Sequence, residues 1–158
     1  MKISADWLSA PATQTVLAML SSGGYQAFAV GGCVRNTILN VPVSDVDITT
    51  DARPDAVVAL AKKAGLKSVP TGYDHGTVTV VIDGTGFEIT TFRKDVHTDG
   101  RHAVVDFADS LLDDAHRRDF TMNALYVDAR GLVTDPQNGL ADLAARHVRF
   151  IDNAHDRI

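Results

Sequence analysis

A pair of adjacent glycines followed closely by two aspartates constrains this sequence more than any other feature. Residues 28–30 are a short apolar run, Gly31 and Gly32 favour a tight turn, and the apolar pattern after them predicts a brief helix. Asp45 and Asp47 follow on a second expected strand, where alternation of side chains would point both carboxylates to one face. The stretch therefore predicts a strand, a turn and a helix beside a strand that carries two like charges.

The two aspartates allow two interpretations. In the simpler one, Asp45 and Asp47 lie on an edge strand and face solvent, as isolated Asp-x-Asp triplets commonly do. In the other, a cation between them offsets their repulsion, and Mg²⁺ prefers carboxylate and phosphate oxygens as ligands. The glycine turn favours the second, because residues without Cβ let backbone N–H groups approach a phosphate, and the following helix offers its positive end. A phosphate cradle beside a metal site predicts phosphoryl or nucleotidyl transfer.

A third carboxylate is expected from a β-hairpin further along the chain. Residues 77–82 are rich in β-branched side chains, residues 87–92 form a second strand, and an Asp-Gly pair between them is typical of a turn. Glu88 lies between apolar neighbours on this strand and must face water or a ligand. It is also the single glutamate among 20 acidic residues, which reflects either a need for the longer side chain or a bias against glutamate. If the two carboxylate strands are neighbours, Glu88 joins the same site.

The rest of the sequence supplies helices and loops around this centre. Further helices are expected at residues 11–22, 54–64, 113–123 and 140–146, and a second hairpin at residues 125–134. Asp51 is expected to cap the helix that begins at Pro54. The polar stretch 93–109 shows no periodicity and is expected to be a loop, either functional or plain surface. The expected fold class is α/β (α+β): one domain, residues 1–158, with a small mixed, mostly antiparallel sheet and helices packed on the side away from the carboxylates.

Composition narrows the classes of partner. The net charge of −5 argues against a domain that holds nucleic acid firmly by itself, because that needs a clustered positive face. The single cysteine, Cys33, cannot form a disulfide within the chain, which fits a reducing compartment. No apolar signal core follows Met1, and no apolar run approaches the length of a membrane span. We therefore expect a cytoplasmic protein with no membrane partner.

A charged cluster on the expected helix at residues 113–123 is a candidate nucleotide clamp. Arg118 would offer paired donors to a triphosphate, while Asp119 and Asn123 would hydrogen-bond ribose hydroxyls. Arg35, in the helix after the glycine turn, would reach the same phosphates. The simpler interpretation is an exposed helix face with a salt bridge.

Taken in order, these motifs resemble the catalytic head of class II tRNA nucleotidyltransferases, the CCA-adding enzymes, and of bacterial poly(A) polymerases, within the polymerase-beta superfamily. The similarity runs from about Tyr25 to Ile158. The matching segments are Gly31 through Arg35, Asp45 with Asp47, Phe87 through Arg93, Thr98 through His102, Arg117 through Ala124, and Asp135 through Leu143. Several independent motifs in the family's order are difficult to obtain by chance.

The resemblance implies a reaction and a role for each motif. It implies that Asp45 and Asp47 hold Mg²⁺ and that Glu88 is the third catalytic carboxylate. It places Arg101 in a flexible loop. The implied nucleotide-binding residues are Gly31, Gly32, Arg35, Arg118, Asp119 and Asn123. The implied reaction is attack by the 3′-hydroxyl of tRNA on the α-phosphate of CTP or ATP, with release of pyrophosphate, accelerated mainly by positioning and electrostatics.

Two departures from the family pattern affect these expectations. Asn36 stands where the family has Asp, which removes a charge near the phosphate site and is expected to have a mild effect. In the family, a base-selecting helix and then the helical neck, body and tail follow the position that matches Ile158, and we expect these parts to be absent here. We therefore expect an excised or split head, incomplete without a second chain that supplies those parts, or a natural short protein that gains selectivity from a partner or has another role.

Three functions remain open from the sequence. CCA addition to tRNA leads, and poly(A) synthesis or nucleotidyl transfer to another acceptor is the alternative within enzymes. A non-catalytic nucleotide-binding module is the third. Against the last stands the presence of three carboxylates on one polar face, which a purely structural domain does not need.

Overall fold

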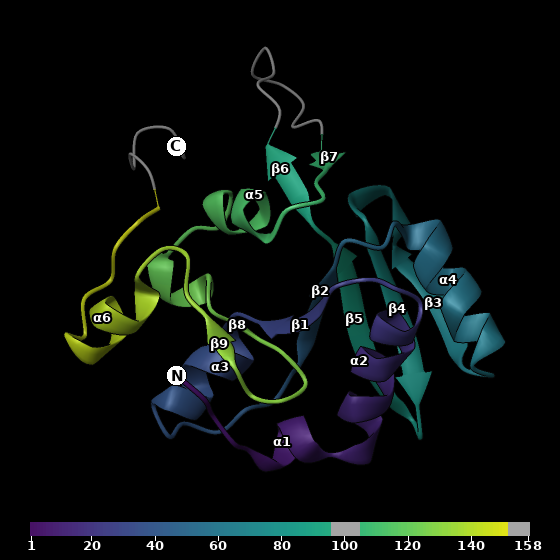
Figure 1. The fold of residues 1–158 in the computed structure, drawn as a ribbon, viewed down its shortest axis with the longest axis horizontal. Helices are drawn as coiled ribbons and strands as arrows, with labels where there is room; N and C mark the ends of the chain where they lie inside the picture. Colours follow the sequence, from purple (N-terminus) through teal and green to yellow (C-terminus); the bar gives the residue numbers. More distant parts are fainter. Residues whose placement is uncertain (96–104, 152–158) are drawn as a thin grey trace.

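A seven-stranded mixed sheet organises the computed structural model, which describes residues 1–95 and 105–151 (Figure 1). In order across the sheet the strands are β3 (Lys67–Gly72), β4 (Thr77–Ile82), β5 (Thr85–Thr91), β2 (Asp47–Thr50), β1 (Ala27–Val30), β8 (Tyr126–Val127) and β9 (Val133–Thr134). Neighbouring strands are antiparallel except for β2 and β5, which are parallel. The expected mostly antiparallel α/β fold is confirmed.

Helices cover one face of this sheet. They are α1 (Asp6–Ser9), α2 (Pro11–Ser22), α3 (Gly32–Ile38) and α4 (Pro54–Lys63). Figure 1 shows α2 and α4 beside each other against the strands. Ile48 of β2 and Ile89 of β5 are buried in the main core with Leu17 of α2. Because successive strand residues alternate between faces, Asp47 and Glu88 project from the opposite face.

A smaller apolar cluster lies on the face that carries the carboxylates. Val30 of β1 and Tyr126 of β8 pack there with Ala115 of α5 (Leu111–His116). The Phe28 ring lies beside them, with its centroid 6.4 Å from that of Phe92 and 6.1 Å from that of Tyr126. Helix α5 therefore packs against the β1–β8 part of this face, while the carboxylates of β2 and β5 stay exposed.

The segment at residues 113–123 differs from the single helix that the sequence suggested. Helix α5 ends at His116, and a 3₁₀ turn, η2 (Thr121–Asn123), follows. Phe120 between them is extended, with φ −110° and ψ 148°, and forms an isolated bridge with Phe150. Its ring packs on Phe150 with centroids 4.7 Å apart, so a local aromatic contact replaces helical packing at this position.

Two further expectations are corrected. Residues 93–109 are not wholly loop, since β6 (Arg93–Asp95) and β7 (Val105–Phe107) form an antiparallel ribbon; Arg101 lies outside the described residues. Asp51 does not cap α4, because its Oδ1 accepts a hydrogen bond of 2.8 Å from the Gln26 backbone N–H.

The hairpins β4–β5 and β8–β9, helix α2 and helix α6 (Gly139–Ala144) are as expected. None of the helices in the described part of the chain is long and apolar enough to cross a membrane.

The turn between β1 and α3 depends on glycine at position 31. Gly31 has φ +80° and ψ −128°, a conformation that residues with a Cβ rarely adopt. Its N–H donates to the Leu125 carbonyl (3.1 Å), and its carbonyl accepts from the Arg35 N–H (3.0 Å). Gly32 is different, because a Cβ there would lie in ordinary contact, 3.4 Å from Nη2 of Arg35.

Gly31→Ala should lower the free energy of unfolding by about 1–2 kcal/mol, the cost of placing a Cβ in a left-handed conformation. Gly32→Ala is the matched control and should change it by less than about 0.5 kcal/mol. Urea denaturation of both variants at one pH measures the difference. Equal losses would contradict the assignment of strain to Gly31 alone.

Candidate active site

Three carboxylates meet on the exposed face where β2 and β5 run parallel. Asp47 is opposite Glu88 in the β2–β5 register, on strands that lie about 4.8 Å apart. Asp45 precedes β2 and is not on the strand as expected, because pairing with β1 begins at Asp47, opposite Val30. Asp45 nevertheless lines the same pocket, of about 310 Å³, together with Asp47, Glu88 and Gly86. The structure therefore brings the three predicted carboxylates together.

The carboxylate of Asp47 lies close enough to two other carboxylates to be repelled by them. Partial burial raises its pKa first, Glu88 and Asp45 raise it further by repulsion, and Arg118 lowers it. A bound cation would offset this repulsion, and carboxylate oxygens are ligands that suit Mg²⁺. Within residues 1–95 and 105–151, no three side chains of His, Cys, Asp or Glu form a group that could hold an ion by themselves. An ion on the two aspartates would therefore take other ligands from water and phosphate, as Mg²⁺ commonly does.

A second pocket joins the carboxylates to the glycine turn. It has a volume of about 210 Å³ and is lined by Gly32, Arg35 and Asn36 as well as by Asp45 and Asp47. The first amide groups of α3 lack acceptors within the helix, which suits them to a phosphate oxygen. Since both pockets share the two aspartates, one elongated ligand can contact the turn and the carboxylates.

A larger cavity, of about 620 Å³, lies away from this chemistry. It is formed by the N-terminal segment and the turn at Ala129 and Arg130, and contains none of the predicted site residues. We place the candidate site where the carboxylates, the glycine turn and the arginines come together, because these groups can bind and react with a ligand. The volume of a cavity alone does not indicate such chemistry.

Three of the predicted nucleotide-binding side chains form a hydrogen-bonded chain. Nη1 of Arg35 donates to Oδ1 of Asn123 (2.7 Å), and Nδ2 of Asn123 donates to Oδ1 of Asp119 (3.1 Å). Oδ1 of Asp119 also accepts from the Phe120 backbone N–H (2.7 Å). This chain connects α3 to η2, so the glycine turn and the Arg-Asp motif belong to one site.

Asn36 orients Arg35 without adding a charge. Its Oδ1 accepts from Nε of Arg35 (3.1 Å), while its Nδ2 donates to the Pro42 carbonyl (3.2 Å). An aspartate at this position would keep the first contact and lose the second, because a carboxylate has no N–H donor. The departure at position 36 therefore preserves the placement of Arg35.

Arg118 is held by a buried carboxylate that the sequence reasoning missed. Asp114 has no exposed side-chain area, and its Oδ2 accepts from Nη2 (3.0 Å) and Nε (3.2 Å) of Arg118 and from the Tyr126 hydroxyl (2.6 Å). Its Oδ1 accepts from Nε of Arg117 (3.2 Å) and from the Arg93 backbone N–H (3.1 Å), and it forms an ion pair with Nη2 of Arg117 (3.1 Å). The available signal was spacing, since Asp114 and Arg118 are one helical turn apart.

These contacts decide the protonation of the cluster. Burial by itself would raise the pKa of Asp114, but Arg118 and Arg117, with hydrogen bonds from Tyr126 and the Arg93 N–H, hold it below its usual value. Burial raises the pKa of Tyr126. Asp114 is therefore ionised and Tyr126 neutral at neutral pH, so the Tyr126 hydroxyl donates to the carboxylate.

Cys33 lies beside the site but is not a candidate nucleophile. Its side chain is 3% exposed, and burial raises the pKa of the thiol to about 11. Because the thiolate is the reactive form, the thiol is inert near neutral pH. Cys33 contributes to the site as a packed side chain in the main core.

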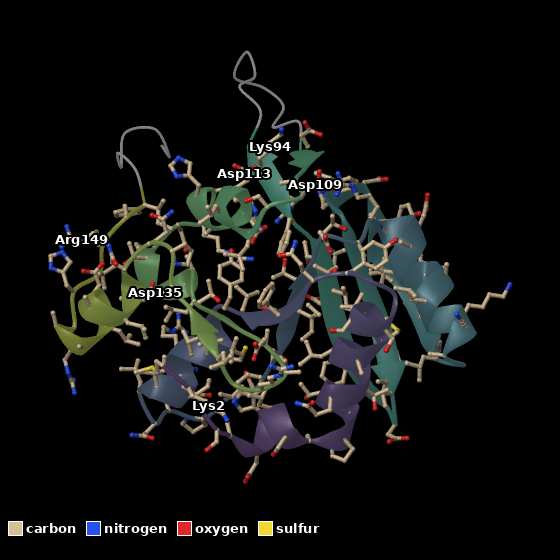
Figure 2. All side chains as sticks on the ribbon, in the orientation of Figure 1. Lys2, Lys94, Asp109, Asp113, Asp135 and Arg149 are labelled. Carbon is tan, nitrogen blue, oxygen red and sulfur yellow. The ribbon has the colours of Figure 1, made fainter. Side chains whose placement is uncertain are left out.

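Helix α6 fixes the position of η2. Asp135 (Figure 2) caps this helix through the backbone N–H groups of Gly139 (2.7 Å) and Leu140 (3.0 Å). Gly139 lies so close to the Thr121 carbonyl that a Cβ at this position would overlap it. The Thr121 hydroxyl donates to Oδ2 of Asp142 (2.6 Å). Thus the segment that carries Asn123 is anchored from its far side.

Known proteins resemble this chain closely. Residues 27–149 match the family described as Poly A polymerase head domain. The CCA-adding enzyme of Levilactobacillus brevis is 45% identical over 144 residues, covering 90% of this chain and 35% of that protein. The CCA-adding enzyme of Oceanobacillus iheyensis is 42% identical with the same coverage. The chain spans about a third of the length of these curated relatives.

Solved structures agree with the sequence relatives. The crystal structure of the Bacillus stearothermophilus CCA-adding enzyme in complex with CTP matches with a TM-score of 0.81 and 40% identity, covering 91% of this chain and 34% of that chain. A tRNA nucleotidyltransferase complexed with a primer tRNA and an incoming ATP analog matches with a TM-score of 0.64 and 28% identity. It covers 86% of this chain and 37% of that chain.

Asp114→Asn should lower the free energy of unfolding by about 3 kcal/mol at pH 7, because it leaves buried arginine charge uncompensated. The folded-state pKa of Asp114 is depressed, so its contribution is fully present above the unfolded pKa of about 3.9 and is lost as pH falls through the folded value. The loss should therefore be constant from pH 5 to 8 and shrink below pH 4. Urea denaturation across this range measures it. The exposed Asp113 (Figure 2) provides the control Asp113→Asn, and an equal effect of both variants would refute the prediction.

Asp47→Asn should raise the melting temperature by about 1–3 °C at pH 7 in the presence of a chelator. The pKa of Asp47 is higher in the folded state than in the unfolded state, so ionisation of Asp47 destabilises the folded protein. This destabilisation is absent below the unfolded-state pKa and grows as the pH rises above it. The gain should vanish below about pH 4. Calorimetry at both pH values, with exposed Asp74→Asn as control, tests this. A lower melting temperature of Asp47→Asn at pH 7 would mean that the repulsion is not present.

Proposed function

This chain belongs to the poly(A) polymerase head-domain family, and we propose that it is the catalytic head of a nucleotidyltransferase that adds CMP and AMP to the 3′ end of tRNA. The observation that carries the proposal is the β2–β5 register, which sets Asp47 opposite Glu88 beside the glycine turn. Carboxylates beside a phosphate-binding turn suit nucleotidyl transfer. The named relatives are CCA-adding enzymes, which favours tRNA as the acceptor.

The proposed reaction is attack by the acceptor 3′-hydroxyl on the α-phosphate of CTP or ATP, with release of pyrophosphate. The backbone amide of Gly32 and the guanidinium of Arg35 would bind the triphosphate in the smaller pocket. Gly31 would shape the turn instead of donating to the ligand, because its N–H already donates to the Leu125 carbonyl. Asp119 and Asn123 would orient the ribose through hydrogen bonds. Arg118 would approach the triphosphate from the β8 side. Positioning of this kind supplies much of the rate in phosphoryl transfer.

Asp45 and Asp47 would hold Mg²⁺, with Glu88 as the third carboxylate of the site. The bound metal supplies a lowered pKa of the attacking hydroxyl and charge neutralisation on the triphosphate. The raised pKa of Asp47 supports this assignment, because a bound cation would offset both causes, the partial burial of the carboxylate and its repulsion from Glu88 and Asp45. Two carboxylates with phosphate and water are an ordinary ligand set for this ion.

The proposal includes partners beyond the nucleotide. ATP, CTP and a tRNA 3′ end are the proposed ligands, since relatives are described as complexes with CTP, an ATP analog and tRNA. The net charge of −5 favours weak RNA binding by this domain alone, so we propose that base selection and tRNA binding need further segments or a second chain. We propose a cytoplasmic location, in line with the single unpaired cysteine.

Poly(A) synthesis is the second candidate, because the matched family is described by that activity. Both activities use the same carboxylates and differ in the acceptor and in when addition stops. A non-catalytic nucleotide-binding role is the less favoured choice, since the three carboxylates repel one another and bring such a module no benefit.

Incorporation of labelled CTP and ATP, supplied singly with Mg²⁺ onto tRNA transcripts lacking part or all of CCA, tests the proposal. Asp45→Ala should reduce incorporation by at least about 10²-fold, because a metal ligand is removed. Asp55→Ala removes the same charge from an exposed position on α4 and should leave incorporation unchanged.

The products separate the candidates. Addition that stops at CCA supports CCA addition, whereas an extended tract from ATP alone on unstructured RNA supports poly(A) synthesis. Nucleotide binding that depends on Mg²⁺ without incorporation would mean an incomplete head. Equal incorporation by the wild type and Asp45→Ala would refute the proposed site.

A further inference from the structure

The buried carboxylate of Asp114 uses both oxygens to hold two arginines. Oδ2 accepts from Arg118 and from the Tyr126 hydroxyl, and Oδ1 accepts from Arg117 and the Arg93 backbone N–H. A buried ion pair of this kind adds little to the stability of the fold, because apolar side chains of similar volume commonly give an equally stable protein. An arrangement of this kind does fix a guanidinium in one orientation.

The sheet register places this cluster next to the carboxylate site. Asp47 is opposite Glu88 on one side and opposite Val30 on the other, and Val30 is opposite Tyr126. Residues that are opposite each other on neighbouring strands project from the same face, about 4.8 Å apart per strand. The Tyr126 side chain therefore starts two strands from Asp47 on the face that carries the reactive groups.

The contacts that Arg118 makes with described residues leave one edge of its guanidinium for a ligand. Nε donates to the Tyr126 hydroxyl (3.1 Å) and to Asp114, and Nη2 donates to Asp114 (3.0 Å). The guanidinium carbon also lies 5.6 Å from the centroid of the Tyr126 ring. The side chain is 18% exposed, so it is neither sealed in the core nor free in solvent. Within residues 1–95 and 105–151 no side chain or carbonyl accepts a hydrogen bond from Nη1, so this edge is the part that a phosphate can approach.

We propose that Asp114, together with the Tyr126 hydroxyl, is a positioning residue that holds Arg118 with its Nη1 edge toward the triphosphate. The inference rests on the proposed function for the identity of the ligand, but the orientation of Arg118 is a property of the free protein. Asp114 itself contacts no substrate. It fixes in advance a side chain that would otherwise lose rotamer freedom on binding.

Proton exchange of the Arg118 Nε–H tests the positioning without a ligand. Its NMR signal is assigned by its loss in Arg118→Lys, and the exposed Arg130 serves as an internal reference. In the wild type the Arg118 proton should exchange at least about tenfold more slowly than that of Arg130. Asp114→Asn and Tyr126→Phe should each remove most of this protection, whereas Asp113→Asn should not.

Tyr126→Phe keeps the test decisive if Asp114→Asn does not fold, since it removes only a hydroxyl. Retained protection of the Arg118 proton in a folded Tyr126→Phe variant would overturn the proposal, because the Tyr126 hydroxyl is one half of the proposed pair. Retained protection in a folded Asp114→Asn variant would overturn it as well.

A double-mutant cycle tests the consequence for the ligand. The Kd for ATP with Mg²⁺ should rise roughly tenfold when Asp114→Asn is made in the wild type. It should rise less than about twofold when Asp114→Asn is added to Arg118→Ala. A general defect of the fold would weaken binding equally in both backgrounds, and that outcome would overturn the proposal. If the wild type binds neither ATP nor CTP, the proposed function fails, while the exchange measurement still decides whether Asp114 positions Arg118.

Discussion

The parallel pairing of β2 with β5 is the contact on which the site depends. It sets Asp47 opposite Glu88, although the two residues are far apart in the chain. Ile48 and Ile89, which follow them, are opposite each other on the helix-covered face and are fully buried. A shift of one residue in this register would bury the carboxylates and expose the isoleucines, so hydrophobic burial fixes the geometry of the reactive face.

The charges around the carboxylates are arranged in two opposite ways. On β2 and β5 the negative groups are close together, and partial burial of Asp47 with repulsion from Glu88 and Asp45 raises its pKa and favours a cation. At Asp114 a negative group is buried between arginines, which lowers its pKa and secures the ion pair. The first arrangement would be completed by the positive charge of a metal ion. The second is complete within the chain and gives the site a fixed positive edge.

Several elements distant in sequence are joined around the glycine turn. The Gly31 N–H bonds to the Leu125 carbonyl, and Arg35 bonds to Asn123, so α3 is attached both to the start of β8 and to η2. Helix α6 supports η2 from the other side through Thr121 and Asp142. These polar contacts explain why motifs separated by more than half of the chain act as one site: each fixes the backbone that presents the next.

Local pattern and side-chain chemistry determined much of this protein in advance. The β-branched runs and the Asp-Gly pair specified the β4–β5 hairpin, and the glycine pair specified the turn before α3. The strand patterns identified the three carboxylates, and the family resemblance implied their catalytic roles. Only the tertiary structure decided that α5 breaks before Phe120, where packing on Phe150 outweighs helical periodicity, and that Asp45 lies off the strand. It alone gave Asp114 its role, because burial and partners from β6 and β8 turn an ordinary helix aspartate into the anchor of Arg118.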